Sequence, residues 1–350
     1  MSVHDLMRDN IRRLEPYKCA RDEAGSGMRI YLDANENWAP IDGCVDINRY
    51  PDSSNLDVRE AVGRAFGLPA SSLAIGNGSD ELIDLLIRIF CIPGKDSILV
   101  LPPTYGEYSV LASINDVRVV ECPLREDFSI DEEATAEMMR RHRPKLTFFC
   151  SPNNPSGNSL CRDVMLRLAA LNEGITVVDE AYIDFTDKPG ITLEDIRAND
   201  RIVVLRTLSK AWALAGARIG IMLACDEILE ASYNVKYPYN ISRPAATEAI
   251  KALSCTDAFR RRLEEEKANR AWLMEAMRAL PIVRQVLSSD ANFFLARFDE
   301  PRRIYEELKG RGIVLRDRSG MLHCDGCLRI TVGSRSECEE LVRTLEELCS

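Results

Sequence analysis

Short apolar runs alternate with amphipathic stretches along the first two thirds of the chain. Periodic stretches predict helices at 55–67, 79–91, 104–114 and 161–173, with an acidic helix before residue 145. The apolar runs predict strands at 97–103, 117–123, 145–152, 175–182, 201–208 and 218–224. Continuous apolar strands between helices are typical of a mostly parallel sheet that is covered on both faces. The pattern therefore predicts a doubly wound α/β domain over residues 31–245.

The pattern changes near residue 245. A long charged helix is predicted at 257–280, and shorter strand and helix patterns follow it to the end of the chain. These predict a smaller α+β domain over residues 246–350. The first thirty residues predict an N-terminal arm with a helix and the flexible stretch "DEAGSG", packing with the small domain.

Composition and charge narrow the function classes. The 350 residues exceed what one compact core usually takes, and 46% hydrophobic with 29% charged residues is typical of a globular protein. The formal net charge of −10 and the absence of a dense Lys/Arg block argue against a nucleic-acid partner. No stretch has the length of a membrane span, and the amphipathic start lacks an apolar signal core. We therefore expect a cytoplasmic protein with no membrane partner.

Twelve cysteines without a secretion signal favour free thiols in a reducing compartment. One local cluster, "HCDGC", contains His323, Cys324 and Cys327. A structural zinc site needs four ligands, and no second pair lies nearby. The thiols also precede a predicted strand, where a redox dithiol would open a helix. We expect incidental cysteines in a hairpin and no metal site.

Polar side chains follow several predicted strands at their carboxyl ends. Asn154 follows 145–152, Asp179 lies near the end of 175–182, and Lys210 follows 201–208. Each residue has an ordinary interpretation on its own, such as a turn, a helix cap or a surface charge. Because ligands bind beyond the carboxyl ends of parallel strands, the combination predicts one site.

The residue types in this set fit pyridoxal 5′-phosphate. Lys210 offers an amine that can form a Schiff base with the cofactor's aldehyde. Asp179 would keep the ring nitrogen protonated, which makes the ring an electron sink. The remaining contacts are predicted as follows: Asn154 and Tyr182 for the phenolate oxygen, the backbone of Ser79 and Asp80 with the side chains of Arg218, Thr207 and Ser209 for the phosphate, and Tyr105 for stacking on the ring.

Seven motifs, in this order and spacing, resemble the fold-type I aminotransferases: "LDANENWAP", "NRYPD", "GNGSDELI", "SPNNPSG", "VVDEAY", "LRTLSKAWALAGARIG" and "CLRITVG". The chain is most similar to the histidinol-phosphate aminotransferase family of the class II subfamily, from Tyr17 to Gly333. The resemblance implies a large cofactor-binding domain plus a smaller one. It also implies transfer of the amino group of L-histidinol phosphate to 2-oxoglutarate, which gives imidazole acetol phosphate and L-glutamate in histidine biosynthesis.

The resemblance also assigns roles. Lys210 matches the lysine that moves a proton between the substrate Cα and the cofactor C4′, and Asp179 and Tyr182 match its neighbours in the catalytic group. Tyr50 of "NRYPD" matches a tyrosine that reaches the cofactor phosphate of the neighbouring subunit. A homodimer with shared active sites is therefore implied.

The substrate side follows by the same resemblance. Arg329 matches an arginine that binds a substrate anion, and Arg316 and Tyr17 match groups that help bind the phosphate of histidinol phosphate. Two arginines in one pocket suit a dianionic phosphate. Asn37 lies in a substrate-side segment of the family. From the residues alone, both arginines could equally be solvated charges at a strand edge, and Tyr17 and Tyr50 could simply pack at an interface.

Other functions stay open. A threonine-phosphate decarboxylase or an aromatic amino-acid aminotransferase would use the same scaffold and the same Lys210. A non-catalytic relative is disfavoured by the intact set Asn154, Asp179, Tyr182 and Lys210. A nicotinamide-dependent enzyme is disfavoured because no G-x-G-x-x-G motif follows the first strand.

Overall fold

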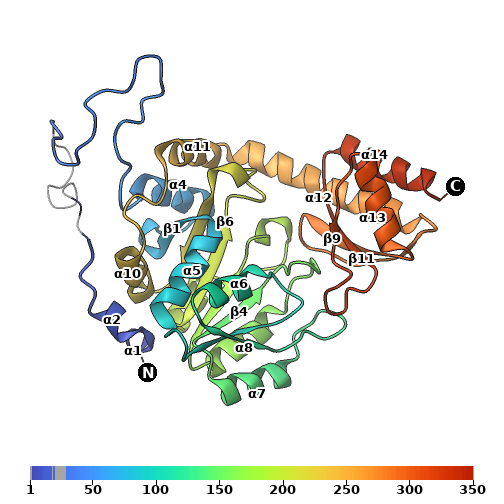
Figure 1. Ribbon diagram of the computed structural model, residues 1–350, viewed down its shortest axis with the longest axis horizontal. Helices are drawn as coiled ribbons and strands as arrows, with labels where there is room; N and C mark the ends of the chain where they lie inside the picture. The colour runs from blue at the N-terminus through green and yellow to red at the C-terminus, as the bar shows by residue number, and fades with distance from the viewer. Residues whose placement is uncertain (1, 18, 20–28, 350) are drawn as a thin grey trace.

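The computed structural model describes residues 2–17, 19 and 29–349 (Figure 1). The expected flexible stretch at residues 22–27 lies outside them. The larger part of the molecule is built on a seven-stranded sheet in the order β1-β7-β6-β5-β4-β2-β3. Its strands are β1 (Leu73–Asn77), β2 (Ser97–Val100), β3 (Arg118–Glu121), β4 (Leu146–Cys150), β5 (Ile175–Asp179), β6 (Ile202–Thr207) and β7 (Ile219–Leu223).

The large sheet is mostly parallel, as the sequence predicts. Strands β3, β2, β4, β5 and β6 pair in parallel, whereas β7 runs antiparallel to both β6 and β1. The sequence pattern did not predict β1, which adds the strand at the other edge. Since the five parallel strands share one direction, their carboxyl ends open on one edge of the sheet.

Helices cover both faces of this sheet (Figure 1). Alternate strand residues point to opposite faces, so Phe149 and Val178 enter one core while Phe148 and Val177 enter the other. The first core is closed by α4 (Leu56–Phe66), α7 (Glu132–His142), α8 (Arg162–Leu171), α9 (Leu193–Ala198) and α11 (Arg243–Leu253). The second is closed by α1 (Val3–Leu6), α2 (Asp9–Arg12), α5 (Gly78–Phe90), α6 (Glu107–Ile114) and α10 (Asp226–Val235).

The C-terminal part forms its own layer of sheet and helices. Its antiparallel sheet has the order β10-β11-β9-β8. The elements are α12 (Thr256–Arg278), β8 (Val283–Val286), β9 (Phe293–Phe298), α13 (Pro301–Gly310), β10 (Arg316–Asp317), β11 (Cys327–Thr331) and α14 (Arg335–Glu347). One face of this sheet packs a third core with α12, α13 and α14, and the other faces the large part of the molecule.

Two expectations about the division of the chain are corrected. The arm was expected on the small domain, but α1 and α2 pack against α10 of the large part, and Arg8 donates to carbonyls of Arg88 and Ile89 at the end of α5. An amphipathic helix must bury its apolar face, and Val3 and Leu6 find that surface here. Helix α11 packs on α4, so the packing of the large part extends past residue 245.

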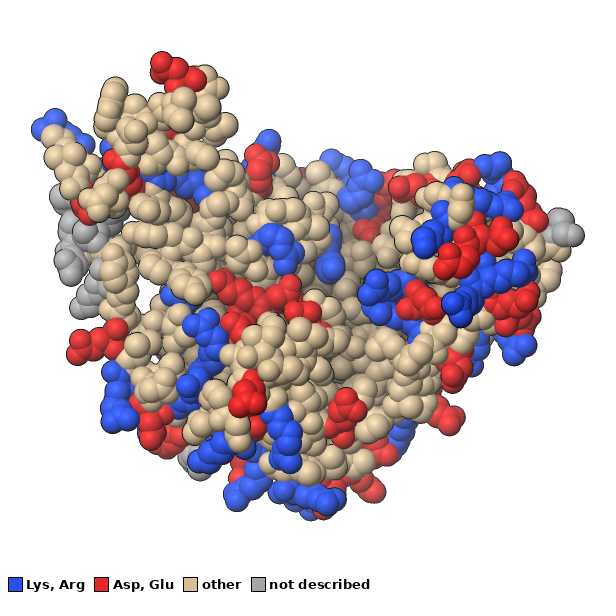
Figure 2. Space-filling view, viewed as in Figure 1, with Lys and Arg blue, Asp and Glu red and all other residues tan. Residues whose placement is uncertain are grey.

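Charged side chains of both signs are interspersed over the face in Figure 2. They are dense over the small domain, and the projecting segment at the upper left also carries both signs among uncharged atoms. Within the described residues, no helix is long and apolar enough to cross a membrane.

The junction of β7 with α5 gives a stability prediction. A Cβ added at Gly220 would lie 2.3–2.5 Å from backbone atoms of Gly78 and Ser79. Gly220→Ala should therefore lower the free energy of unfolding by about 1–3 kcal/mol or more. Gly216→Ala is the control, because a Cβ there meets nothing within 4 Å. Chemical denaturation measures both variants, and equal losses would contradict this packing.

Candidate active site

A cavity of about 370 Å³ opens at the carboxyl ends of the parallel strands. It gathers most residues that the sequence singled out, although they are spread over 250 positions of the chain, a span from Ser79 to Arg329. Its lining residues are Ser79, Asp80, Tyr105, Cys150, Asn154, Asp179, Ala181, Tyr182, Thr207, Ser209, Lys210, Arg218, Arg316, Arg318 and Arg329.

Asp179 forms the floor of the cavity at the last position of β5. Its side chain is 3% exposed, and its carboxylate accepts hydrogen bonds from the Tyr108 hydroxyl at 2.7 Å and the Ala181 N–H at 3.1 Å. Burial raises the pKa of Asp179 despite these two donors, because both of them are neutral. The carboxylate thus lies where a positively charged partner would stabilise it most.

Tyr108 is held rigidly. It is fully buried in α6, and its ring stacks on Phe148 with centroids 4.7 Å apart. The sequence analysis missed this residue, which lies three positions after Tyr105 in the same motif. Its hydroxyl fixes one oxygen of Asp179, and the carboxylate is therefore oriented by two separate elements.

Lys210 follows β6 and is open to the cavity. Its Nζ lies 5.5 Å from the ring centroid of Tyr182. Partial burial lowers the pKa of Lys210, and the nearby cations Arg329 and Arg218 lower it further, against Asp80 and Asp179. A lysine with a lowered pKa carries more of the neutral amine that attacks carbonyl groups.

One end of the cavity is built for an anion. Helix α5 begins there, and its first N–H groups, including those of Ser79 and Asp80, have no side-chain cap. Gly78 adopts φ +77°, which lets the Arg218 guanidinium lie where a Cβ would be. Arg218 itself has φ +56°, and its Nη2 contacts an Asp80 oxygen at 3.2 Å. Strain of this kind in a non-glycine residue is typical of functional sites.

Hydroxyl groups complete this end. Thr207 donates to the carbonyl of Ile219 at 3.0 Å, and the hydroxyls of Thr207 and Ser209 lie 3.0 Å apart. Arg218 Nη1 reaches the Ser209 hydroxyl at 3.4 Å. The predicted phosphate-binding set is therefore brought together in one place.

Asn154 and Tyr182 line the cavity near Arg329, whereas Tyr105 lies toward the start of α5. The Asn154 carbonyl accepts a hydrogen bond from Arg329 Nη1 at 2.5 Å, which leaves its amide nitrogen as the donor. Burial raises the pKa of Tyr182, so its hydroxyl keeps its proton and remains a donor. The Tyr105 hydroxyl donates to Asp80 at 3.2 Å.

Arginines of the small sheet also line the cavity. Arg316 of β10 lies directly opposite Arg329 of β11. Arg318, which the sequence analysis did not single out, lines the same cavity two residues further on. Positions two apart on a strand share one face, so the pattern "RDR" contains the signal that would have found it.

Three predicted residues do not line this cavity. Tyr17 and Asn37 are exposed on the segments that connect α2 with α4, so the expected contact with substrate is not formed within one chain. Tyr50 stacks on Tyr239 with centroids 4.5 Å apart and lines a neighbouring cavity that also contains Arg218. Asn35 and Glu36 line that neighbouring cavity together with Asn77, the last residue of β1.

The "HCDGC" cluster has a structural environment. Cys324, in the turn before β11, and Cys327, the first residue of β11, are buried free thiols, and burial raises the pKa of Cys324 to about 12. A His323 ring nitrogen lies 3.2 Å from the Leu124 carbonyl. Among the described residues, no group of three or more His, Cys, Asp or Glu side chains could hold a metal ion.

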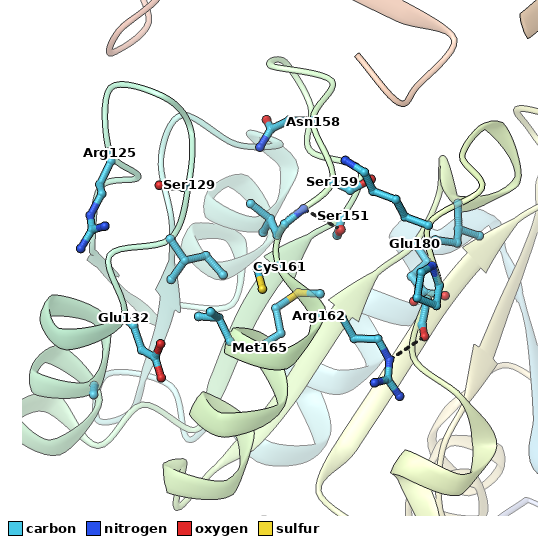
Figure 3. A pocket seen from close by; sticks show the side chains of 18 of the residues that line it. Arg125, Ser129, Glu132, Ser151, Asn158, Ser159, Cys161, Arg162, Met165 and Glu180 are labelled. Carbon is cyan, nitrogen blue, oxygen red and sulfur yellow. Dashed lines mark hydrogen bonds between the residues drawn. The ribbon is translucent and has the colours of Figure 1, made fainter. Parts of the chain in front are cut away.

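A larger cavity of about 1150 Å³ lies elsewhere, between α7, α8 and the loop around Lys188 (Figure 3). Its basic side chains are matched by carboxylates: Arg162 pairs with Asp195, and Lys188 pairs with Asp290. None of the predicted site residues lines it. Glu180, the residue after Asp179, lines it and pairs with Arg206. We therefore assign the chemistry to the smaller cavity.

Comparison with known proteins agrees with this geometry. The sequence model of the family described as aminotransferase class I and II matches residues 31–345. A histidinol-phosphate aminotransferase from Cytophaga hutchinsonii is 43% identical over 351 residues, covering 99% of each chain. The chain belongs to the class I and II aminotransferases.

Solved structures show the same aminotransferase architecture. The histidinol-phosphate aminotransferase from Clostridium acetobutylicum matches with a TM-score of 0.79 and 25% identity, over 87% of this chain and 91% of that one. The enzyme from Sinorhizobium meliloti, determined in complex with pyridoxal 5′-phosphate, matches with a TM-score of 0.80 and 23% identity, over 87% and 83%. The second likeness concerns the fold alone.

The buried Asp179 of this aminotransferase gives a pH-dependent prediction for the cofactor-free protein. With a raised pKa in the folded state, the carboxyl binds its proton more tightly there than in the unfolded chain. The free energy of unfolding therefore falls as the pH rises above the ordinary Asp range, because the unfolded chain releases this proton more readily. Below that range the carboxyl is protonated in both states and contributes no such loss. Asp179→Asn should make the cofactor-free protein more stable than the wild type at about pH 7, with the gain shrinking toward about pH 4.

Chemical denaturation at several pH values measures this difference. Asp200→Asn, which changes an exposed carboxyl, is the matched control. A destabilised Asp179→Asn protein at neutral pH, or a gain that does not change with pH, would show that Asp179 carries no unbalanced charge.

Proposed function

We propose that the protein is a pyridoxal 5′-phosphate-dependent aminotransferase that transfers the amino group of L-histidinol phosphate to 2-oxoglutarate. The observation that carries the proposal is that Lys210, the buried Asp179 and a cluster of arginines line one cavity. An amine, a buried acid and an anion-binding wall are the three elements that this reaction needs.

The donor set of the cavity fits the cofactor. The Asp179 carboxylate, held only by neutral donors, suits a protonated ring nitrogen. The start of α5 with Arg218 suits a phosphate, since helix N–H groups and an arginine fork both bind such oxygens. Asn154 and Tyr182 would donate to the phenolate oxygen, and Tyr105 would lie against the ring.

When bound, the cofactor supplies an electron sink that stabilises negative charge on the substrate Cα. The chain's own groups do the rest. Lys210 would hold the cofactor through its aldehyde carbon, and its amine would move the proton at the substrate Cα. Its lowered pKa, set by burial and by Arg329, favours the neutral form that accepts this proton.

The arginine side of the cavity selects the substrate. Arg316 and Arg329 lie opposite each other and present two guanidinium groups to the same space. A dianionic phosphate monoester matches this charge better than a single carboxylate or a neutral aromatic ring. The Cytophaga hutchinsonii relative, a histidinol-phosphate aminotransferase 43% identical over 99% of each chain, supports the same substrate.

Steady-state kinetics test the substrate directly. Glutamate formation and CO₂ release should be followed with L-histidinol phosphate, L-phenylalanine and L-threonine phosphate. We expect glutamate from L-histidinol phosphate and 2-oxoglutarate with the highest kcat/KM. Release of CO₂ from threonine phosphate, or a preference for phenylalanine, would replace this function by one of the alternatives on the same scaffold.

Lys210 is tested by substitution. Lys210→Ala should lower transamination by about a thousandfold or more, because the amine both holds the cofactor and moves the proton. In the wild type, borohydride should fix the cofactor to the peptide that contains Lys210, as peptide mass analysis would show. Lys251→Ala, an exposed lysine on α11, is the control. Retained turnover in Lys210→Ala would overturn the mechanism.

A homodimer with shared active sites is the second part of the proposal. The projecting segment 29–55 exposes apolar side chains: Leu32 is 93%, Trp38 86%, Ile41 78% and Val45 72% exposed. Several large apolar side chains exposed on one segment are typical of an interface. Tyr50 lies at its base beside the cavity that contains Arg218, which is where a second copy would meet the phosphate end.

Mixing two inactive variants tests the shared site. In a dimer that shares its sites, a hybrid of Tyr50→Ala with Lys210→Ala subunits carries both defects in one site and none in the other. Random mixing should then restore about a quarter of the wild-type activity. No recovery above the parent variants, with exchange of subunits verified by mass, would mean that each site is built from one chain.

We also propose a cytoplasmic location. Among the residues that the structure describes, no two cysteines form a disulfide, and seven of the twelve cysteines are buried. Thiols that stay reduced are typical of a reducing compartment.

A further inference from the structure

The arginines above the active-site cavity lie on one face of the β10–β11 hairpin. Arg316 is paired in register with Arg329, and like charges directly opposite one another destabilise an antiparallel pair. Arg318 continues the pairing, since its N–H donates to the Cys327 carbonyl at 3.0 Å. Three positively charged side chains thus line one cavity. Their mutual repulsion lowers the stability of the hairpin, and the fold alone gives no reason for this loss.

No carboxylate balances this cluster within the described part of the chain. The intervening acid, Asp317, accepts from the backbone and hydroxyl of Ser319, at 2.8 and 2.6 Å, and belongs to the other face. The Nε atoms of Arg318 and Arg329 are buried without a hydrogen-bond partner. Burial lowers the pKa of Arg318, and Arg329 and Arg316 lower it further.

Two partly buried arginines elsewhere in the protein are paired with acids: Arg162 donates to both oxygens of Asp195, and Arg206 donates twice to Glu180. Arg59 and Arg297 also bury an Nε without a partner, but each donates from another guanidinium nitrogen to a backbone carbonyl, that of Ala70 or His323. The unpaired arginine cluster marks a place where the balancing anion comes from the substrate.

We propose that Arg318 is a specificity-determining residue that makes the substrate-anion site a three-arginine receptor for a phosphate monoester. This inference rests on the proposed function and adds a residue to it. A phosphate monoester presents three terminal oxygens and a charge near −2, whereas a carboxylate presents two oxygens and a charge of −1. Arg316 and Arg329 match the dianionic charge, and Arg318 supplies hydrogen-bond donors for the third terminal oxygen, which a carboxylate lacks.

The experiment compares Arg318→Gln and Arg318→Lys with the wild type, all as cofactor-loaded enzymes. L-Histidinol phosphate, L-histidinol and 2-oxoglutarate serve as substrates, and inorganic phosphate serves as a competitive inhibitor. Arg302→Gln, an exposed arginine of α13, is the control for the loss of one charge in the same domain. Thermal unfolding of each variant reports any general loss of structure.

Arg318→Gln should raise KM for L-histidinol phosphate and the inhibition constant of phosphate by about 10- to 100-fold. The kcat at saturation and the KM for 2-oxoglutarate should change by less than about threefold, because the interaction is the same in the bound substrate and the transition state. Arg318→Lys should fall between, since it keeps the charge and loses the planar fork. A structural role would instead change all substrates together.

Two failures are distinguishable. If the wild type prefers L-histidinol phosphate to L-histidinol but Arg318→Gln keeps that ratio, the role of Arg318 is overturned and the proposed function stands. If the wild type shows no preference for the phosphorylated substrate, both are overturned.

Discussion

The active site depends on one buried charge. Asp179 ends a strand at the centre of the sheet, is nearly inaccessible to water and is oriented by Tyr108 and the Ala181 N–H. Neutral donors do not offset the cost of burying a carboxylate, which shows in its raised pKa. The site is therefore arranged to receive a cation, and the direction of that carboxylate fixes where a protonated ring nitrogen would lie relative to Lys210.

The two parts of the molecule contribute different charged groups to this cavity. The large sheet supplies the acid and the amine from the ends of its parallel strands, and the small sheet supplies arginines from a hairpin. Arg329 joins the two parts through its hydrogen bond to Asn154. The same arginine lowers the pKa of Lys210. Substrate binding and proton transfer are in this way electrostatically connected, because an anion on Arg329 would weaken its effect on the lysine.

Much of this arrangement follows from the sequence, and the exceptions have physical causes. The strand-end position of Asp179 was predictable because apolar strands and polar strand ends are local signals. Strand β1, "LAIGN", was missed since it is short and contains a glycine and an asparagine, which are rare in strands. The apolar face of the arm helices was visible, but not the surface that it covers. In sequence Tyr108 resembles any core tyrosine, and only the fold places it beside Asp179. The spacing of Arg318 from Arg316 was visible in the sequence, but the hairpin register that puts Arg316 opposite Arg329 was not.

The most direct test is the ¹⁵N NMR signal of the ring nitrogen in enzyme loaded with ¹⁵N-labelled pyridoxal 5′-phosphate. The account predicts a protonated nitrogen throughout the pH range in which the enzyme is folded, and a signal that shifts to the neutral position in Asp179→Asn. A neutral ring nitrogen in the wild type near neutral pH would contradict the pairing with Asp179 on which the assignment rests.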